Sequence, residues 1–351
     1  MLSDSDILFE RRGAAGLVTL NRPQALNAVS LAMVRALTGQ LRAWETDPAV
    51  TRVIVTASGG RAFSAGGDLR ALYDLGRAGR YHEALTFWRE EYALNALIKH
   101  YRKPYVALID GIVMGGGVGV SVHGSHRVAG DRFVFAMPEV GIGFFPDIGA
   151  TWFLPRLPGE VGTYCALTGE RIRAADSVAG GIATHRVASA RFPELVEALC
   201  GTVPVDALLG AFALPAGEGP VAAQRSAIDR LCKGDRVEDI LRALDHAASD
   251  GTHAAFAGAT AALIRTKSPT SLKIALMQLR RGPALDFDEC MRTEYRIVSR
   301  VVRGHDFYEG VRAVIVDKDQ APRWQPPALE AVSDADVERH FAPVADELVL
   351  P

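Results

Sequence analysis

The sequence predicts an α/β (α+β) fold in which helices cover both faces of the sheets. Short β-branched runs alternate with longer segments whose apolar residues recur at helical spacing, a pattern typical of an α/β fold with covered sheets. Two such runs, Arg52–Thr56 and Tyr105–Ile109, are each followed by a glycine-rich segment. From about Val221 onward the pattern is almost wholly helical. We therefore expect an α/β core followed by a helical C-terminal region.

The first hundred residues predict a hairpin and two long helices. Ile7–Glu10 and Gly16–Leu20 are short apolar runs separated by a turn-like sequence, which indicates a β-hairpin. Ser30 is expected to cap a helix that stops at Asp47-Pro48. The next long helix is expected over Tyr81–Tyr101, before the strand Tyr105–Ile109.

The second half divides into regions of different composition. Residues 201–220 are rich in Gly, Ala and Pro, which predicts a linker or insertion. We expect a core with the ligand site over residues 1–200, and a helical region with a proline-rich tail over residues 221–351. The helices expected around and after the linker are Thr151–Leu157, Glu160–Thr168, Val237–Ala247, Thr252–Arg265, Thr270–Arg281 and Asp286–Arg303.

Composition excludes several classes of protein. The chain has 351 residues, 48% of them hydrophobic, which is enough for a large core. The net charge of −2 gives no electrostatic case for nucleic acid or an anionic membrane surface. The four cysteines lack metal-ligand spacing and are expected to be reduced. No signal-type apolar core begins the chain, and no uninterrupted apolar run has the length of a membrane span, so a cytoplasmic protein is expected.

The stretch Ala107–Thr151 contains the strongest functional signal. Its glycine triplet, Gly115–Gly117, follows a predicted strand and enters an apolar segment. Backbone N–H groups at such a point are open to a ligand, because no Cβ blocks approach and the first turn has no internal acceptor. Gly66-Gly67 also follow a strand, so both segments are expected to face one site. Close helix packing is the alternative explanation for each, and neither matches a dinucleotide or P-loop fingerprint.

Two carboxylates follow the triplet in an apolar loop. Glu139 lies among Met137, Val140 and Phe144, and burial there is expected to raise its pKa into the range of a general acid or base. A solvated loop charge is the alternative. Asp147 follows Pro146, and a turn could bring it back towards Glu139; it could also cap the next helix. The residues alone therefore suggest acyl chemistry on a bound carbonyl.

Several blocks of the chain resemble the enoyl-CoA hydratase/isomerase (crotonase) superfamily. The blocks are NRPQALNAVS, AFSAGGDL, DGIVMGGGVG and AMPEVGIGFFPDIGAT. More narrowly, the chain resembles the 3-hydroxyisobutyryl-CoA hydrolase branch of this superfamily. The blocks that carry this resemblance are FWREEYALN, KPYVALIDGIVMGGGVGVSVHG and YRIVSRVVRGHDFYEGVRAVIVDKDQAPRW. The likeness covers nearly the whole chain. It implies a crotonase-like spiral of repeated ββα units followed by a helical C-terminal region.

The resemblance also implies an activity and residues for it. The expected reaction is hydrolysis of a short β-hydroxyacyl-CoA thioester, 3-hydroxyisobutyryl-CoA to 3-hydroxyisobutyrate and coenzyme A, a step of valine catabolism. Gly67 and Gly116 match the backbone donors of an oxyanion hole, and Glu139 and Asp147 match the two catalytic acids. Glu91 matches a substrate-contacting position, although its residue type alone indicates a solvated helix charge. Glu139 either attacks the carbonyl or activates water.

Position 119 separates this chain from hydratases of the superfamily. Those enzymes carry a second glutamate two residues after the triplet, whereas Gly119 stands here. Enoyl-CoA hydration or isomerisation is therefore the disfavoured alternative. Two further alternatives are a non-catalytic acyl-CoA-binding protein and a thioesterase with a different substrate. The substrate of the latter would be 3-hydroxypropionyl-CoA or another short hydroxyacyl-CoA.

The partners follow from the same resemblance. No metal or redox cofactor is expected, since coenzyme A is part of the substrate. Arg22, Arg61 and Arg70 flank the first glycine segment as candidate contacts for its phosphates, or as ordinary surface charges. A homo-oligomer, trimer or hexamer, is common in the superfamily, but a helical C-terminal half could close on its own monomer. The oligomeric state therefore stays open.

Overall fold

Two β-sheets, and the path of the chain between them, define the structure. The computed structural model describes residues 5–249 and 252–350. Within them the larger sheet has the order β1-β2-β3-β5-β7-β10 and the smaller sheet the order β4-β6-β8-β9. The larger sheet consists of β1 (Ile7–Arg12), β2 (Ala15–Leu20), β3 (Arg52–Ala57), β5 (Tyr105–Ile109), β7 (His126–Ala129) and β10 (His185–Arg186). The smaller sheet consists of β4 (Ala62–Ser64), β6 (Ile112–Met114), β8 (Val134–Ala136) and β9 (Ile172–Arg173).

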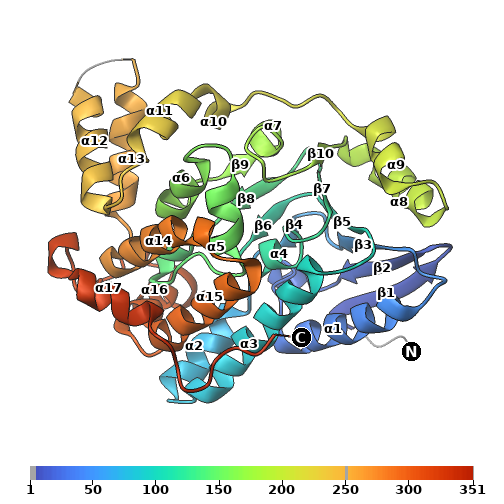
Figure 1. Ribbon diagram of the computed structural model, residues 1–351, viewed down its shortest axis with the longest axis horizontal. Helices are drawn as coiled ribbons and strands as arrows, with labels where there is room; N and C mark the ends of the chain where they lie inside the picture. Colours follow the sequence, from blue (N-terminus) through green and yellow to red (C-terminus); the bar gives the residue numbers. More distant parts are fainter. Residues whose placement is uncertain (1–4, 250–251, 351) are drawn as a thin grey trace.

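Three strand pairs repeat one connection between the sheets. β3, β5 and β7 lie parallel and adjacent in the larger sheet. Each is followed after a short turn by β4, β6 or β8, which lie parallel and adjacent in the smaller sheet. Helical segments then carry the chain onward to the next pair (Figure 1). This path is the predicted spiral of ββα units, and the predicted fold class is confirmed.

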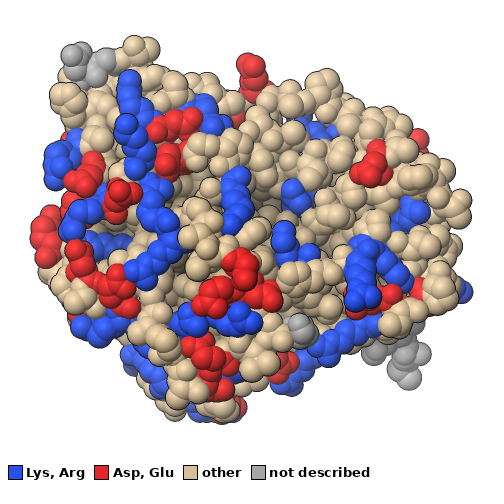
Figure 2. Space-filling view, viewed as in Figure 1, with Lys and Arg blue, Asp and Glu red and all other residues tan. Residues whose placement is uncertain are grey.

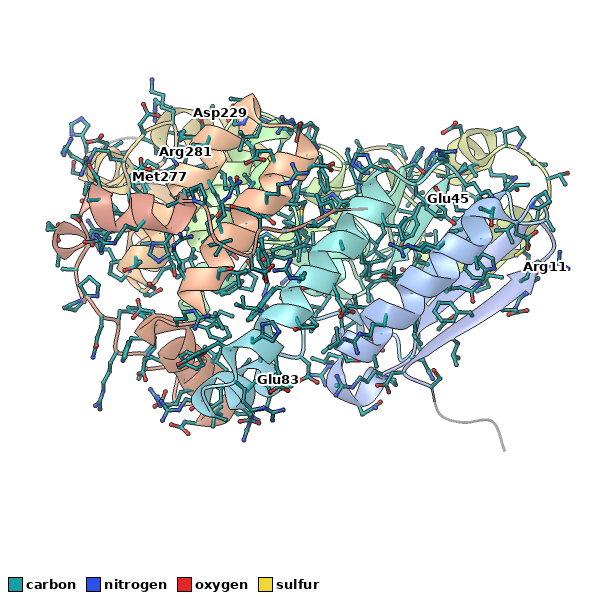
Figure 3. The ribbon with its side chains drawn as sticks, turned by 60° about the horizontal axis from the view of Figure 1, so that its bottom comes forward. Arg11, Glu45, Glu83, Asp229, Met277 and Arg281 are labelled. Atoms are coloured by element: carbon teal, nitrogen blue, oxygen red, sulfur yellow. The ribbon has the colours of Figure 1, made fainter. Side chains whose placement is uncertain are left out.

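The N-terminal elements form as their sequence patterns predict. β1 and β2 pair antiparallel as a hairpin, and β2 pairs parallel with β3. α1 (Leu31–Thr46) begins after Ser30, whose hydroxyl accepts a hydrogen bond from the Met33 N–H. α3 (Tyr81–Lys99) lies beside α1 and runs in the same direction (Figure 3). The opposite side of α3 contacts α15 (Phe287–Val301), so this helix is enclosed in the interior.

Apolar side chains cover both faces of the larger sheet. Because neighbouring strand residues face opposite sides, Val53 and Val55 join the main core beside α1 and α3. Ile54 faces the other side, where the sheet packs against α8 (Phe192–Cys200) and α9 (Val205–Phe212). The sheet is therefore buried on both faces, as its short β-branched strands require.

Helix α9 lies within residues 201–220, where a linker or insertion is predicted. Val205, Leu209 and Phe212 are buried on one side of the helix and pack against the sheet. These three residues recur at helical spacing, but the Gly, Ala and Pro residues around them favour a linker in the sequence. The remainder of the segment runs extended along one edge of the molecule to α10 (Figure 1).

The C-terminal half is helical, as predicted. Ser268 caps α14 through a hydrogen bond to its side chain from the Ser271 N–H. The main cluster of buried apolar residues contains both Ile7 and Leu348, so the chain ends share one core; the division at residues 200 and 221 stays a proposal. The other α-helices are α2 (Leu69–Arg77), α4 (Gly116–Gly119), α5 (Ala150–Phe153), α6 (Val161–Thr168), α7 (Ala174–Ser177), α10 (Pro220–Ala223), α11 (Arg225–Leu231), α12 (Val237–Ser249), α13 (Ala254–Arg265), α14 (Pro269–Arg281), α16 (His305–Val311) and α17 (Asp334–Phe341).

The surface of the described residues carries mixed charge. Figure 2 shows acidic and basic side chains intermingled over the C-terminal helices, where ion pairs such as Arg236–Asp334 join neighbouring elements. None of the helices in residues 5–249 and 252–350 is both long and apolar enough to cross a bilayer.

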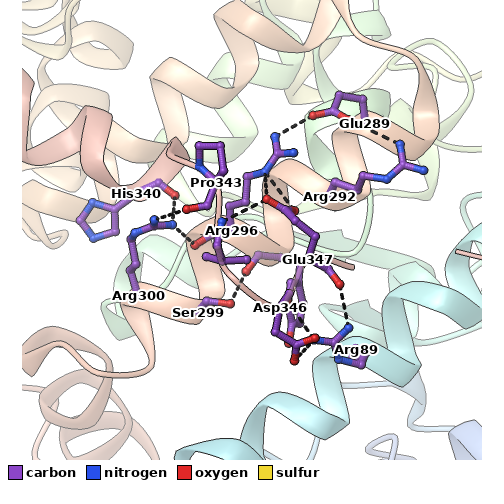
Figure 4. A network of polar contacts seen from close by, with 12 residues as sticks. Arg89, Glu289, Arg292, Arg296, Ser299, Arg300, His340, Pro343, Asp346 and Glu347 are labelled. Carbon is purple, nitrogen blue, oxygen red and sulfur yellow. Dashed lines mark hydrogen bonds and ion pairs between the residues drawn. The ribbon is translucent and has the colours of Figure 1, made fainter. Parts of the chain in front are cut away.

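A polar network fastens the C-terminal tail across α3 and α15 (Figure 4). Arg89 of α3 donates to the Tyr295 hydroxyl at 2.7 Å and forms an ion pair with Asp346 of the tail. Arg296 of α15 forms an ion pair with Glu347 at 2.9 Å. The tail therefore links a helix from the first third of the chain to one from the last third.

Arg89→Met is expected to release this tail. The change removes the guanidinium that binds Asp346 and Tyr295 but keeps much of the aliphatic stem. Amide hydrogen exchange in residues 343–350 should rise about tenfold, while the free energy of unfolding falls by only about 1 kcal/mol, because these ion pairs are partly exposed. Arg35→Met, which removes an exposed pair with Glu90, is the control. Unchanged exchange in the tail of Arg89→Met would contradict this role.

Candidate functional site

Both glycine segments and three carboxyl side chains meet in one small cavity of about 70 Å³. Its carboxyl groups belong to Glu91, Glu139 and Asp147. The apolar part of its wall is formed by Leu72, Phe87, Trp88, Met114, Ile142 and Phe144.

A larger hollow of about 460 Å³ lies beside α12 and α14. Two of its three acidic residues, Glu238 and Asp245, are held in ion pairs with Lys273 and Arg265. We therefore assign the candidate site to the smaller cavity, because its lining combines glycine backbones with three carboxyl groups, although its volume is lower.

The two glycine segments approach each other at the ends of β4 and β6. Gly66 (φ +121°) and Gly115 (φ +44°) adopt backbone conformations that side chains disfavour. Gly116 begins α4, so its N–H lies in a first turn that offers no internal acceptor. A Cβ at Gly116 would lie 3.3 Å from the Gly67 nitrogen and 2.6 Å from Glu91 Oε1. Only glycine therefore lets the two backbones and the carboxyl group come this close.

The three carboxyl groups come from separate elements and are all buried. Glu91 lies on α3, Glu139 begins the 3₁₀ turn Glu139–Ile142, and Asp147 follows that turn. Their exposed fractions are 2%, 5% and 5%. Asp147 Oδ2 accepts a hydrogen bond from the Tyr92 hydroxyl at 2.9 Å. Glu91 Oε1 and Glu139 Oε2 have no hydrogen-bond partner among the described residues, and are available to a ligand.

Burial controls the protonation of this cluster. Desolvation raises the pKa of Glu139 well above the ordinary value, and the nearby charge of Asp147 raises it further. The pKa of Glu91 is raised by the same two causes in the same order. Desolvation also raises the pKa of Asp147, although the hydrogen bond from Tyr92 opposes this shift. The cluster therefore holds protons at a pH where exposed carboxyl groups have lost them.

The structure brings together every residue that the sequence singled out for the site. Gly67, Gly116, Glu91, Glu139 and Asp147 all line the one cavity. Glu91 is not a solvated helix charge, because α3 is enclosed by other helices.

The alternative reading of Asp147 as a helix cap is wrong. Gly149 is the N-cap of α5, and the Asp147 side chain instead accepts from Tyr92.

Two of the three flanking arginines are held in ion pairs. Arg22 binds Asp68 at 2.9 Å and Arg70 binds Asp74 at 3.1 Å. Neither Arg22, Arg61 nor Arg70 lines the cavity.

Four polar residues near the site escape prediction from the sequence. Tyr92, His123, Gln278 and Glu294 contact Asp147 or the backbone beside it. Burial raises the pKa of Glu294 to about 8, opposed by N–H donors from that backbone, and lowers the pKa of His123 to about 3. Tyr92 stands next to Glu91 in the sequence, which is a weak signal. The other three contact the turn from 25 to 145 residues away in the chain, so no local motif marks them.

Comparisons with known proteins agree with this geometry. Residues 15–341 match the sequence model described as enoyl-CoA hydratase/isomerase. The 3-hydroxyisobutyryl-CoA hydrolase, mitochondrial, of Gallus gallus is 44% identical over 98% of this chain and 90% of its own length. The protein of the same name from Xenopus tropicalis is 45% identical over 97% of this chain and 89% of its own length.

Two solved structures are also similar. A carnitinyl-CoA dehydratase from Mycobacterium thermoresistibile has a TM-score of 0.92 and 44% identity, covering 98% of both chains. An enoyl-CoA hydratase from Rhodobacter sphaeroides 2.4.1 has a TM-score of 0.89 and 38% identity, covering 99% of this chain and 100% of its own.

The cytoplasmic location predicted from the sequence is contradicted by these relatives. The hydrolases from Gallus gallus and Xenopus tropicalis are named as mitochondrial proteins. The prediction relied on the absence of a signal-type apolar core and of a membrane-length apolar run, and neither absence distinguishes the cytoplasm from a mitochondrial compartment.

Asp147→Asn is expected to stabilise the protein at high pH. The pKa of the Asp147 carboxyl is higher in the folded protein than in the unfolded chain, so the folded protein keeps this proton at a pH where the unfolded chain has lost it. The stability that this proton contributes is therefore lost as the pH rises from about 4, the unfolded-state pKa, through the raised pKa of the folded state. Asparagine does not titrate and can still accept from Tyr92. Urea unfolding should show the variant more stable than the wild type by about 1–3 kcal/mol at pH 8, with a smaller gap at pH 5. An equal gap at both pH values would contradict the shift.

Proposed function

The chain belongs to the enoyl-CoA hydratase/isomerase family, and from this premise we infer that it hydrolyses 3-hydroxyisobutyryl-CoA to 3-hydroxyisobutyrate and coenzyme A. The relatives named for that activity are 44% and 45% identical to it over nearly its whole length. The observation that carries the inference within the molecule is the meeting of two glycine backbones with Glu139 in one small pocket. Such a pocket provides both an anion site and a reactive carboxylate for acyl transfer.

The glycine backbones are proposed to bind the thioester oxygen. In this proposal the Gly67 and Gly116 N–H groups donate to the carbonyl oxygen and stabilise the negative charge that forms on it. Loss of one such donor typically slows a reaction by about 10²–10³-fold. The nearness of the Gly67 nitrogen to the Gly116 backbone supports the assignment, as does the positive φ at Gly66 and Gly115.

Glu139 is proposed to act on the carbonyl carbon. Its carboxylate either attacks this carbon to form a mixed anhydride, which water then hydrolyses, or removes a proton from an attacking water. In both routes the carbon–sulfur bond breaks and coenzyme A leaves as a thiolate that takes up a proton. A buried carboxylate oxygen with no protein partner suits either role.

Asp147 and Glu91 are proposed to act at the acyl end of the pocket. Tyr92 fixes the Asp147 carboxyl through its hydroxyl, which suits Asp147 to orienting the β-hydroxyl of the substrate or relaying a proton to water. Glu91 Oε1, which lies beside Gly116, is suited to binding the acyl group near the oxyanion site.

Hydration of an enoyl-CoA is the second candidate, because two similar structures are those of a dehydratase and a hydratase. The surroundings of Gly119 argue against it. A Cβ at this position would lie 2.8 Å from the Asn95 amide nitrogen and 3.0 Å from the Ile148 Cβ. The place where hydratases of the superfamily carry a second glutamate is therefore filled by other side chains.

The direct test is release of free thiol from 3-hydroxyisobutyryl-CoA. The wild type should release thiol, and Glu139→Gln should reduce kcat by at least about 10³-fold, because the amide can neither attack nor accept the proton. Glu83→Gln, an exposed change on α3, should leave the rate unchanged. Hydration of crotonyl-CoA by the wild type without thiol release would contradict the assignment.

The pH dependence of kcat/KM provides a separate test. Because the reactive form of Glu139 is ionised and its pKa is raised, the rate should increase with pH over a range well above the ordinary pKa of a glutamate. Removing the Asp147 charge lowers the pKa of Glu139, so Asp147→Asn should move this rise to lower pH while lowering the plateau. A rise centred near pH 4.5 in the wild type would show that Glu139 is not desolvated during catalysis.

A further inference from the structure

The turn that carries Asp147 is held by buried side chains from three distant parts of the chain. Gln278 of α14 donates to the Pro146 carbonyl at 2.5 Å. His123 lies 2.6 Å from the Ile148 carbonyl through Nε2. Glu294 of α15 accepts from the Gly149 N–H at 2.7 Å and from the Thr151 N–H at 2.8 Å.

The backbone of this turn is strained. Ile148 has φ +56°, in the left-handed region that a β-branched residue rarely enters, and Gly149 has φ +89°. A conformation of this kind costs about 1–3 kcal/mol and persists only where the surrounding structure holds it. The contacts from His123 and Glu294 fall on these two residues, immediately after Asp147.

We propose that Glu294 is a positioning residue for Asp147: by binding the Gly149 and Thr151 N–H groups, it fixes the strained turn so that the Asp147 carboxyl points into the pocket. This role extends the proposed function, and its kinetic test rests on the proposed thioester hydrolysis. Both carboxylate oxygens are used, one by each N–H. An amide in the same place offers one acceptor and sets an NH₂ group against the other N–H, so glutamine cannot replace both bonds.

The position of Glu294 is fixed in turn by its neighbours on α15. Glu294 is fully buried and faces the turn. Next to it, Tyr295 accepts a hydrogen bond from Arg89 of α3, and Arg296 forms an ion pair with Glu347 of the tail (Figure 4). α3 also carries the Glu91 and Tyr92 side chains. One frame built from α3, α15 and the tail therefore sets Asp147 relative to Glu91.

The first experiment compares Glu294→Gln with Glu289→Gln in the full chain. Glu289 lies on the same helix but pairs with Arg292 and Arg296. Glu294→Gln should lower kcat for thiol release by about 10–100-fold with KM changed less than about threefold, because the substrate still binds while Asp147 is misplaced. Amide exchange in residues 146–152 should rise. Glu289→Gln should change neither quantity.

A double-mutant cycle with Asp147→Asn separates positioning from a general loss of stability. In the Asp147→Asn background, Glu294→Gln should lower kcat by less than about twofold further, since the group that it positions is already gone. Full additivity of the two effects on kcat would overturn the proposal. If Glu294→Gln does not fold, Glu294→Asp, which keeps the carboxyl group but withdraws it by one methylene, should give the same non-additive pattern.

Failure of the proposed function gives a different result. If the wild type releases no thiol, the assigned activity is wrong, and the exchange measurement still tests the turn. Exchange in residues 146–152 that is unchanged in Glu294→Gln would overturn the positioning role whatever the reaction is.

Discussion

Removal of three carboxyl groups from water is the constraint on which the site depends. Glu91, Glu139 and Asp147 are almost completely buried, and within residues 5–249 and 252–350 no Lys, Arg or His side chain lines their cavity. Burial of ionised groups without a counter-charge is costly, so the groups are driven towards their protonated forms. Protein hydrogen bonds offset this cost only in part, through the Tyr92 hydroxyl on Asp147. Glu91 Oε1 and Glu139 Oε2, which have no protein partner among the described residues, can form hydrogen bonds with a substrate.

The fold makes this arrangement feasible by bringing strand ends together. β4 and β6 are neighbouring parallel strands of the smaller sheet, and each is followed by a glycine segment. The ends of these two strands therefore place Gly67 beside Gly116. The carboxyl groups arrive from α3 and from the loop after β8, and apolar residues such as Trp88 and Phe144, stacked at 5.6 Å, exclude water beside them. The C-terminal helices then enclose α3 and hold the Asp147 turn.

Features encoded by neighbouring residues could be predicted, and those made by distant contacts could not. The glycine segments, Glu139 and Asp147 stand out because their local sequence is unusual for a loop. Glu91 was found only through family resemblance, since nothing in a helix charge indicates burial. Glu294 lies 145 residues from the Gly149 N–H that it binds, and the Gly, Ala and Pro residues around helix α9 favoured a linker over a helix. The predicted location failed because the absence of a signal-type core and of a membrane-length run does not distinguish one cell compartment from another.

Carbon-13 NMR titration of glutamate side-chain carboxyls tests most directly whether Glu139 is a desolvated carboxyl that keeps its proton well above the pH at which an ordinary glutamate loses it. The protein would be labelled at glutamate Cδ, and the Glu139 signal identified by its absence from Glu139→Gln. Desolvation and the charge of Asp147 predict a titration midpoint well above 4.5, the ordinary value for a glutamate. A midpoint at or below 4.5 would contradict the account, because the pocket would then be open to water or would hold a counter-charge.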